Sequence, residues 1–325
     1  MDYILEKKLK ELLNSFNKIR KEIKWTNPYI MHLLAFHYTF NDDEFDKTEF
    51  LELKKHIKAS TNLTSVFRTD INMSIVSSCC MNSLDSKAQF TKTLKTSDFL
   101  IESGFKNWSS LPICSCYMAN FLKSENLKSI CERAYNMYLK MNNRSNLFSL
   151  YEDSSFAILL SIDGNDIDAK LDKSEFLYNH LREMPFEEDE NLQIMTYILS
   201  SSTLSNTELI HNCFQLYILL SNSFQLRSIA YPYIALLTLF NKDNIEIAND
   251  VSDVFSYIKN ISLFDSLNDE YLLFLSISFI ICYYTYNIID NSDNKSTVSV
   301  NKNSVFVFLA ELLITSINNL STKIG

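Results

Sequence analysis

The sequence predicts an all-α fold: an α-solenoid of about six helix-pair repeats, each roughly 40 residues long, with capping helices at both ends. Glycine and proline are rare, at three and four of 325 residues, whereas folds rich in strands need turn residues at most connections. Apolar residues make up 46% of the chain, enough for an extensive core. The third observation is a phenylalanine that recurs at nearly constant spacing.

This recurring phenylalanine marks the repeat. Each occurrence ends an amphipathic segment and precedes a shorter, more apolar one: Phe67, Phe105, Phe148, Phe186, Phe224 and Phe264. The positions eight and nine residues after each of these landmarks are all nonpolar. Because neither segment can bury its apolar face alone, we expect neighbouring pairs to stack.

Each repeat is predicted to pair a short apolar inner helix with a longer amphipathic outer helix. The expected inner helices are 29–40, 71–81, 111–122, 154–161, 192–200, 229–240 and 271–289. The expected outer helices are 47–59, 88–103, 127–141, 169–183, 207–221 and 245–260.

We expect one continuous solenoid in three parts. Residues 1–27 form an N-terminal capping helix, and 28–264 hold the helical pairs. Residues 265–325 supply a C-terminal apolar helix, a mobile loop at 291–303 that is rich in Asn, Ser and Lys, and a final covering helix at 305–320.

Helix ends are predicted from capping residues. A side chain suited to an N-cap follows each landmark by three to five residues: Asp70, Ser109, Asp153, Asn191, Ser228 and Asn268. Pro28, Pro112 and Pro232 are placed in first turns, where the missing N–H costs nothing. Gly104 is placed just after a helix end.

Charge and cysteine usage limit the partners and the compartment. The net charge of −9 disfavours a nucleic-acid partner, which needs clustered Lys and Arg. The seven cysteines are odd in number and have no disulfide spacing, so we expect reduced thiols in a cytoplasmic protein. The first residues lack the apolar run of a secretory signal.

Residues 271–289 contain no charge and reach the lower edge of a membrane span. Ser276, Ser278, Thr285 and Asn287 interrupt the run, and its flanks are acidic. A buried inner helix is therefore favoured, and membrane association through 271–289 stays open as an alternative.

The usual motifs of catalysis, cofactor binding and metal binding are missing. With three glycines, the chain has no Gly-rich phosphate loop. Cys114 and Cys116 are two apart on a predicted helix, so their side chains diverge and do not share an ion. His32 and His37 are five apart, outside the spacing of two ligands on one helix face. We expect no metal and no cofactor.

One set of polar residues follows the landmarks closely enough to share one edge of the stack: Arg68, Glu152, Asp153, Asn191 and Gln193. Such an edge could bind a peptide terminus or a small polar ligand. The alternative is structural, with Asp153 and Asn191 as caps and Arg68 in a local pair.

Several stretches resemble the domain of unknown function family 4003, a family of low-GC Gram-positive bacteria. The stretches that carry the resemblance are 67–68, 104–106, 133–137, 152–153, 157–160, 191–193, 198–199, 231–232 and 236–237. The resemblance runs across most of the chain. The resemblance implies a bacterial cytoplasmic protein and implies no activity.

The leading hypothesis is a cytoplasmic scaffold that binds a protein or peptide along the groove of the solenoid. An enzyme or small-ligand receptor that uses the polar edge is the alternative.

Overall fold

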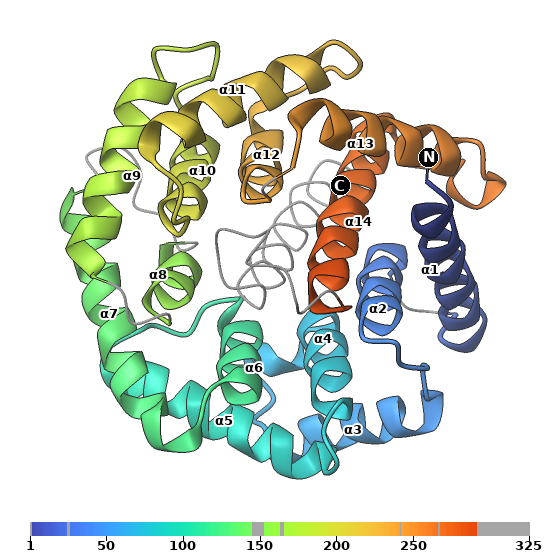
Figure 1. Ribbon diagram of the computed structural model, residues 1–325. Helices are drawn as coiled ribbons and strands as arrows, with labels where there is room; N and C mark the ends of the chain where they lie inside the picture. The colour runs from blue at the N-terminus through green and yellow to red at the C-terminus, as the bar shows by residue number, and fades with distance from the viewer. Residues whose placement is uncertain are drawn as a thin grey trace. The chain divides into compact units, whose positions relative to one another are not determined.

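The computed structural model describes residues 2–24, 27–144, 153–162, 166–240, 242–265 and 267–290. These residues form fourteen α-helices and four 3₁₀ turns, with no strand among them (Figure 1). The prediction of an all-α fold is confirmed.

Long helices alternate along the chain with apolar helices, which are shorter except for α14 with its 22 residues. The long helices are α1 (Tyr3–Glu22), α3 (Lys47–Ser60), α5 (Ser86–Ser103), α7 (Leu127–Arg144), α9 (Ile167–Leu181), α11 (Asn206–Ser221) and α13 (Asn244–Lys259). The apolar ones between them are α2 (Pro28–Phe40), α4 (Asp70–Met81), α6 (Leu111–Phe121), α8 (Asp153–Ser161), α10 (Glu190–Ser200), α12 (Tyr231–Thr238) and α14 (Asp269–Asp290). The 3₁₀ turns are η1 (Val66–Arg68), η2 (Ser124–Asn126), η3 (Ser228–Ala230) and η4 (Ser262–Phe264).

The observed helices match the predicted ones to within a few residues. At 229–240 the helix is two residues shorter at each end than predicted. There the chain forms η3 and then the shorter helix α12, with Pro232 in its first turn. Proline fixes the backbone for a helix start and has no N–H to continue an earlier one, which accounts for the late start. The loop predicted at 291–303 and the helix predicted at 305–320 lie outside the described residues.

The predicted caps are partly wrong. The N-cap of α4 is Thr69 rather than Asp70, and that of α10 is Asp189 rather than Asn191. The prediction is confirmed at Asn268, whose side chain accepts a hydrogen bond from the Tyr271 N–H at 2.8 Å.

The three other cap predictions have different outcomes. Ser110, not Ser109, precedes α6, and its side chain makes no capping bond. Ser228 begins η3 instead of capping a helix. Asp153 is the first residue of α8, and the structure does not describe its side chain.

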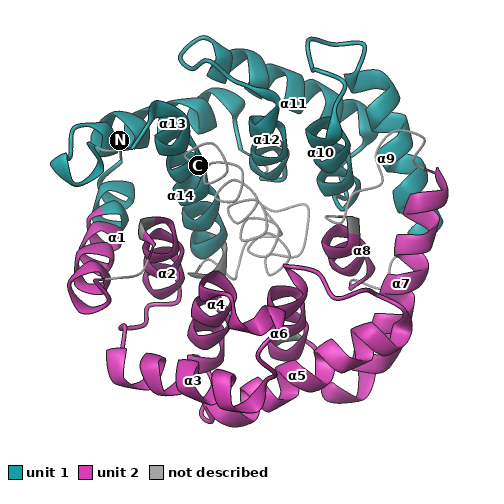
Figure 2. Cartoon of the chain, turned by 180° about the vertical axis from the view of Figure 1, so that it is seen from behind, with its two compact units in different colours: residues 1–9, 163–325 teal, residues 10–162 magenta. Residues whose placement is uncertain are grey.

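The contacts divide the chain into two units: unit 1 comprises residues 1–9 and 163–325, and unit 2 comprises 10–162 (Figure 2). Within unit 2, α3, α5 and α7 pack one after another, and so do α2, α4, α6 and α8. Within unit 1, α9, α11 and α13 form one such series, and α10, α12 and α14 the other. In both units, each of these long helices also packs on the apolar helix that follows it, from α3 on α4 to α13 on α14.

The landmark phenylalanines that the structure describes lie where a long helix gives way to a short one. Phe67 and Phe264 are within η1 and η4, and both are buried. Around Phe67 gathers a core cluster of unit 2: Leu53, Ile57, Met73, Val76, Cys80, Phe90 and Cys116. Phe148 lies outside the described residues.

Four landmarks also pack against an aromatic ring of the next long helix. Ring centroids are 5.9 Å apart for Phe67 and Phe90, 5.3 Å for Phe105 and Tyr135, 4.8 Å for Phe186 and Tyr217, and 5.0 Å for Phe224 and Phe255. These edge-on or tilted contacts join each connection to the following pair.

Gly104 ends α5 in a left-handed conformation with φ +119°, as the sequence predicts for a helix terminus. A Cβ at this position would lie 2.4 Å from Cζ of Tyr135. The glycine therefore serves both the turn and the close approach of α7.

A basic side chain on three long helices donates to carbonyl oxygens where the next short helix ends. Lys92 Nζ is 3.1 Å from Leu122 O, and Arg133 Nε is 3.0 Å from Ser161 O. Lys173 Nζ reaches Ser202 O at 2.8 Å and Leu204 O at 2.7 Å. We call these three contacts carbonyl clamps; they satisfy carbonyls that a helix end leaves without partners.

The apolar segment predicted at 271–289 lies within α14. Every residue of 271–285 is buried, as expected of a covered inner helix. Of the helices that the structure describes, none combines the length and apolarity that crossing a membrane requires.

Candidate functional site

Arg68 is held by the end of α3. Its Nε donates to Thr61 Oγ1 at 3.2 Å, and its Nη2 donates to the carbonyl oxygens of Thr61, at 2.5 Å, and Lys58. The guanidinium thus caps the C-terminus of a helix, where a cation also faces the negative end of the helix dipole.

Asn191 is likewise held by internal contacts. Its Nδ2 donates to Asp189 Oδ2 at 3.2 Å and to Ser228 Oγ at 3.3 Å. The second contact joins the start of α10 to η3, which packs against α10.

An equivalent contact occurs in unit 2, and the sequence analysis missed it. Asn72 Nδ2 donates to Ser109 O at 2.8 Å, across 37 residues, the same separation as between Asn191 and Ser228. Asn72 and Asn191 both follow their landmark phenylalanine by five residues. The recurrence of Asn at this register was the signal that could have found the pair.

Gln193 differs from the other candidates. Only 6% of its surface is exposed, and its Nε2 donates to the Tyr197 hydroxyl one turn later. Its Oε1 is buried and has no hydrogen-bond partner among the residues that the structure describes. A buried hydrogen-bond acceptor without a donor lowers the stability of the fold, so a bound donor at Gln193 Oε1 would be stabilising.

The described residues show no contact that joins all five candidate side chains. Asn191 and Gln193 share α10 of unit 1, whereas Arg68 belongs to unit 2. Glu152 and the side chain of Asp153 lie outside the described residues.

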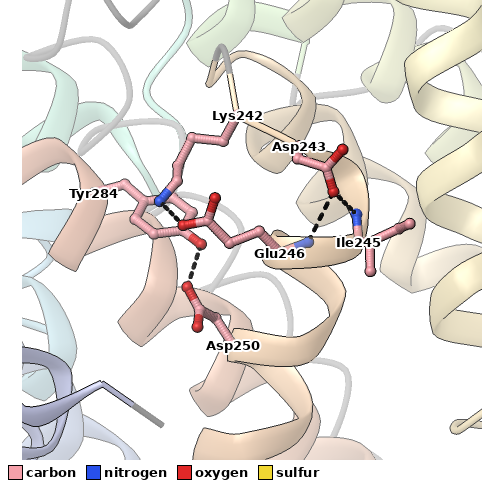
Figure 3. A network of polar contacts seen from close by, with 6 residues as sticks. All are labelled: Lys242, Asp243, Ile245, Glu246, Asp250 and Tyr284. Atoms are coloured by element: carbon pink, nitrogen blue, oxygen red, sulfur yellow. Dashed lines mark hydrogen bonds and ion pairs between the residues drawn. The ribbon is translucent and has the colours of Figure 1, made fainter.

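A polar network that the sequence analysis did not single out joins α13 to α14 (Figure 3). The Tyr284 hydroxyl donates to Asp250 Oδ2 at 2.6 Å. Lys242 forms an ion pair with Glu246, and its Nζ lies 4.4 Å from the centroid of the Tyr284 ring. Asp243 fixes the start of α13 by accepting from the N–H groups of Ile245 and Glu246 at 2.8 and 3.2 Å.

Burial dominates the electrostatics of this network. Burial raises the pKa of Asp250, while the Tyr284 hydroxyl and Lys242 act in the opposite direction. Burial also raises the pKa of Tyr284, and its bond to Asp250 adds to the shift. A tyrosine whose pKa is raised is a weak acid, so the geometry suits a hydrogen bond that ties two helices rather than proton transfer.

Comparison with known proteins gives one match. The model of a family described as "Protein of unknown function (DUF4003)" matches residues 15–311. The chain belongs to this family. Searches of curated proteins and of solved structures gave no significant match.

Two stretches that carried the resemblance to DUF4003 meet in the structure. The ring of Phe105 contacts the rings of Tyr135 and Tyr138, and the Gly104 backbone leaves room for Tyr135. Arg133, in the second of these stretches, forms a carbonyl clamp. In this DUF4003 chain these residues serve packing and helix capping.

His32 and His37, which the sequence analysis considered as metal ligands, make internal contacts. His32 is buried and stacks on Phe16 at 4.4 Å, and burial lowers its pKa to about 3. His37 Nε2 donates to Asn82 Oδ1 at 3.2 Å, and burial lowers the pKa of His37 as well. Both imidazoles are thus neutral at pH 7.

The seven cysteines, all within the described residues, form no disulfide. Cys80 Sγ and Cys116 Sγ are 3.9 Å apart in the unit 2 core, and burial contributes to raising the pKa of Cys116. Buried thiols with raised pKa values are poor nucleophiles. Among the residues that the structure describes, no three of His, Cys, Asp or Glu are arranged to hold a metal ion.

Proposed function

We propose that this DUF4003 protein is a cytoplasmic bacterial scaffold, built as an α-solenoid, that binds a protein or peptide partner. The repeat is supported by contacts that recur with the helix pairs. The carbonyl clamps of Lys92, Arg133 and Lys173 and the Asn contacts of residues 72 and 191 are the examples.

The surface for the partner is assigned to the long helices rather than to the groove. All residues of Leu192–Ser200 in α10 and of Tyr231–Thr238 in α12 are buried, so these short helices offer no free face. Side chains that are buried within the fold serve packing first.

One observation carries the proposal. Each long helix from α3 to α13 has a large apolar side chain that is at least 40% exposed: Leu51, Ile101, Leu139, Phe176, Ile218 and Ile245. A single exposed apolar residue is common on any protein, but one on every long helix recurs with the pairs. Repeat proteins present such recurring side chains to extended partners.

Affinity capture from the cytosol of the source cells tests the proposal. The double variant Phe176→Ser, Ile218→Ser is expected to lose a protein that the parent chain retains. Leu63→Ser with Leu84→Ser is the matched control, since both residues are exposed but lie outside the long helices. Equal capture by both double variants would remove the long helices as the binding surface.

A small-ligand receptor that uses the predicted polar edge is the second candidate function. The buried Oε1 of Gln193, which has no donor among the described residues, favours it. A thermal-shift screen against metabolites tests it: a compound that raises Tm of the parent chain but not of Gln193→Leu supports a receptor, and no such compound argues against one.

A further inference from the structure

The first residues of α1 belong with the C-terminal part of the chain. Residues 1–9 cluster with 163–325, while α1 from Lys10 onward belongs to unit 2. Leu5 and Leu9 are 1% and 0% exposed, so this short segment is packed rather than loose. We call residues 2–9 the N-terminal strap.

The strap grips α14 through Lys8. Its Nζ lies 4.1 Å from the centroid of the Tyr286 ring, and only 7% of Lys8 is exposed. Lysine is almost never buried to this extent without compensation, and the face of an aromatic ring supplies part of it. The contact spans nearly the whole sequence.

A second strap residue also acts on α14. Tyr283 is buried, which raises its pKa, and the carboxylate of Asp2 adds to this shift. The neighbouring Tyr284 is tied to Asp250 of α13. One turn of α14 is therefore contacted by the strap at Tyr286 and by α13 at Tyr284.

We propose that the N-terminal strap is a releasable clasp on the C-terminal half of α14, and that its release is the first opening of unit 1. Two features favour early release. The strap comprises only the first two turns of α1, and Tyr3 and Ile4 at its start are 76% and 57% exposed. Short terminal segments open at lower free energy than packed helices. This inference does not depend on the proposed partner.

Hydrogen exchange on the full chain tests the clasp. Lys8→Met keeps the length of the side chain and removes the charge, so the amides of 279–287 should exchange about 2- to 30-fold faster, as the loss of a cation–π contact predicts. Amides of α10, whose residues 192–200 are all buried, should not change. Lys7→Met changes an exposed neighbour and serves as the control.

Ring variants at the other side of the contact separate charge from packing. Tyr286→Phe keeps the ring and should raise the exchange rates less than Tyr286→Leu, which should behave like Lys8→Met. In the parent chain, strap residues 5–9 and α14 residues 279–287 should open together and before α10. Unchanged exchange in Lys8→Met, or opening of α10 before α14, would overturn the proposal.

Discussion

At the scale of single residues, most polar side chains singled out from the sequence are used internally. Arg68 caps α3, and Asn191 joins α10 to η3. Their partners, the carbonyl oxygens of Lys58 and Thr61 and the hydroxyl of Ser228, follow from the packing of helices and have no marker in the sequence. The residue types at these positions predicted local structural roles, but they did not predict the contacting atoms.

Gly104→Ala is expected to destabilise the protein by about 2 kcal/mol or more. Its φ of +119° is strained for any residue with a Cβ, and the new methyl group would meet the Tyr135 ring. Urea unfolding measures the loss. Gly104→Asn should cost at least as much as Ala, because its Cβ meets the same ring and carries an amide beyond it. A cost for Ala below about 0.5 kcal/mol would contradict the strain.

His32 should make stability depend on pH. Its pKa falls from 6.5 in the unfolded chain to about 3 in the fold, so the unfolded chain takes up the proton first as pH falls. Stability should therefore be full above pH 6.5 and decline toward pH 3, by up to about 1.4 kcal/mol per pH unit from this group.

Unfolding in urea at pH 7.5 and pH 5.5 checks this dependence. His32→Phe preserves a ring to stack on Phe16 and should lose less stability on acidification than the parent. A parent and a His32→Phe variant with identical pH profiles would refute the assignment.

At the scale of helices, the sequence predicted existence and order well and exact ends less well. Hydrophobic periodicity located all fourteen described helices, because each buries a continuous apolar face. The exact start of a helix depends on which of several neighbouring polar residues is its N-cap. Thr69 and Asp70, or Asp189 and Asn191, are all suitable, and backbone geometry decides between them.

Lys173→Met should cost about 1–3 kcal/mol, because two carbonyl oxygens after α10 lose their donor and the lysine is already partly desolvated. Lys173→Arg retains a donor and should restore much of the loss. Lys87→Met, on an exposed position of α5, is the control for the change of side chain. If Lys87→Met and Lys173→Met lower the free energy of unfolding equally in chemical unfolding, the clamp does not stabilise the fold.

At the scale of the whole molecule, the family match covers residues 15–311 and therefore both units. The spacing of the landmarks predicted a helix-pair repeat, and that repeat stays a prediction. Lys92, Arg133 and Lys173 follow the same spacing, but basic residues on a polar helix face look alike in a sequence. Only the position of the following helix end distinguishes them.

Fragments should be most soluble when they end at a landmark. Chains ending at Phe105, Phe186 or Phe264 keep complete long helices, whereas chains ending ten residues earlier cut into α5, α9 or α13 and expose their apolar faces. Soluble yield and helical signal per residue in far-ultraviolet circular dichroism compare the two sets. Indistinguishable yields would count against the predicted boundaries.

The carbonyl clamps also restrict how the chain can change in length. Each residue inserted in a helix turns all later side chains by about 100°, so one insertion between the start of α9 and Lys173 would point its ammonium away from Ser202 or shift the helix start. Insertions between helices leave the clamp geometry intact. Relatives of different length are thus expected to carry extra residues in connections, or as complete helix pairs that bring their own clamp.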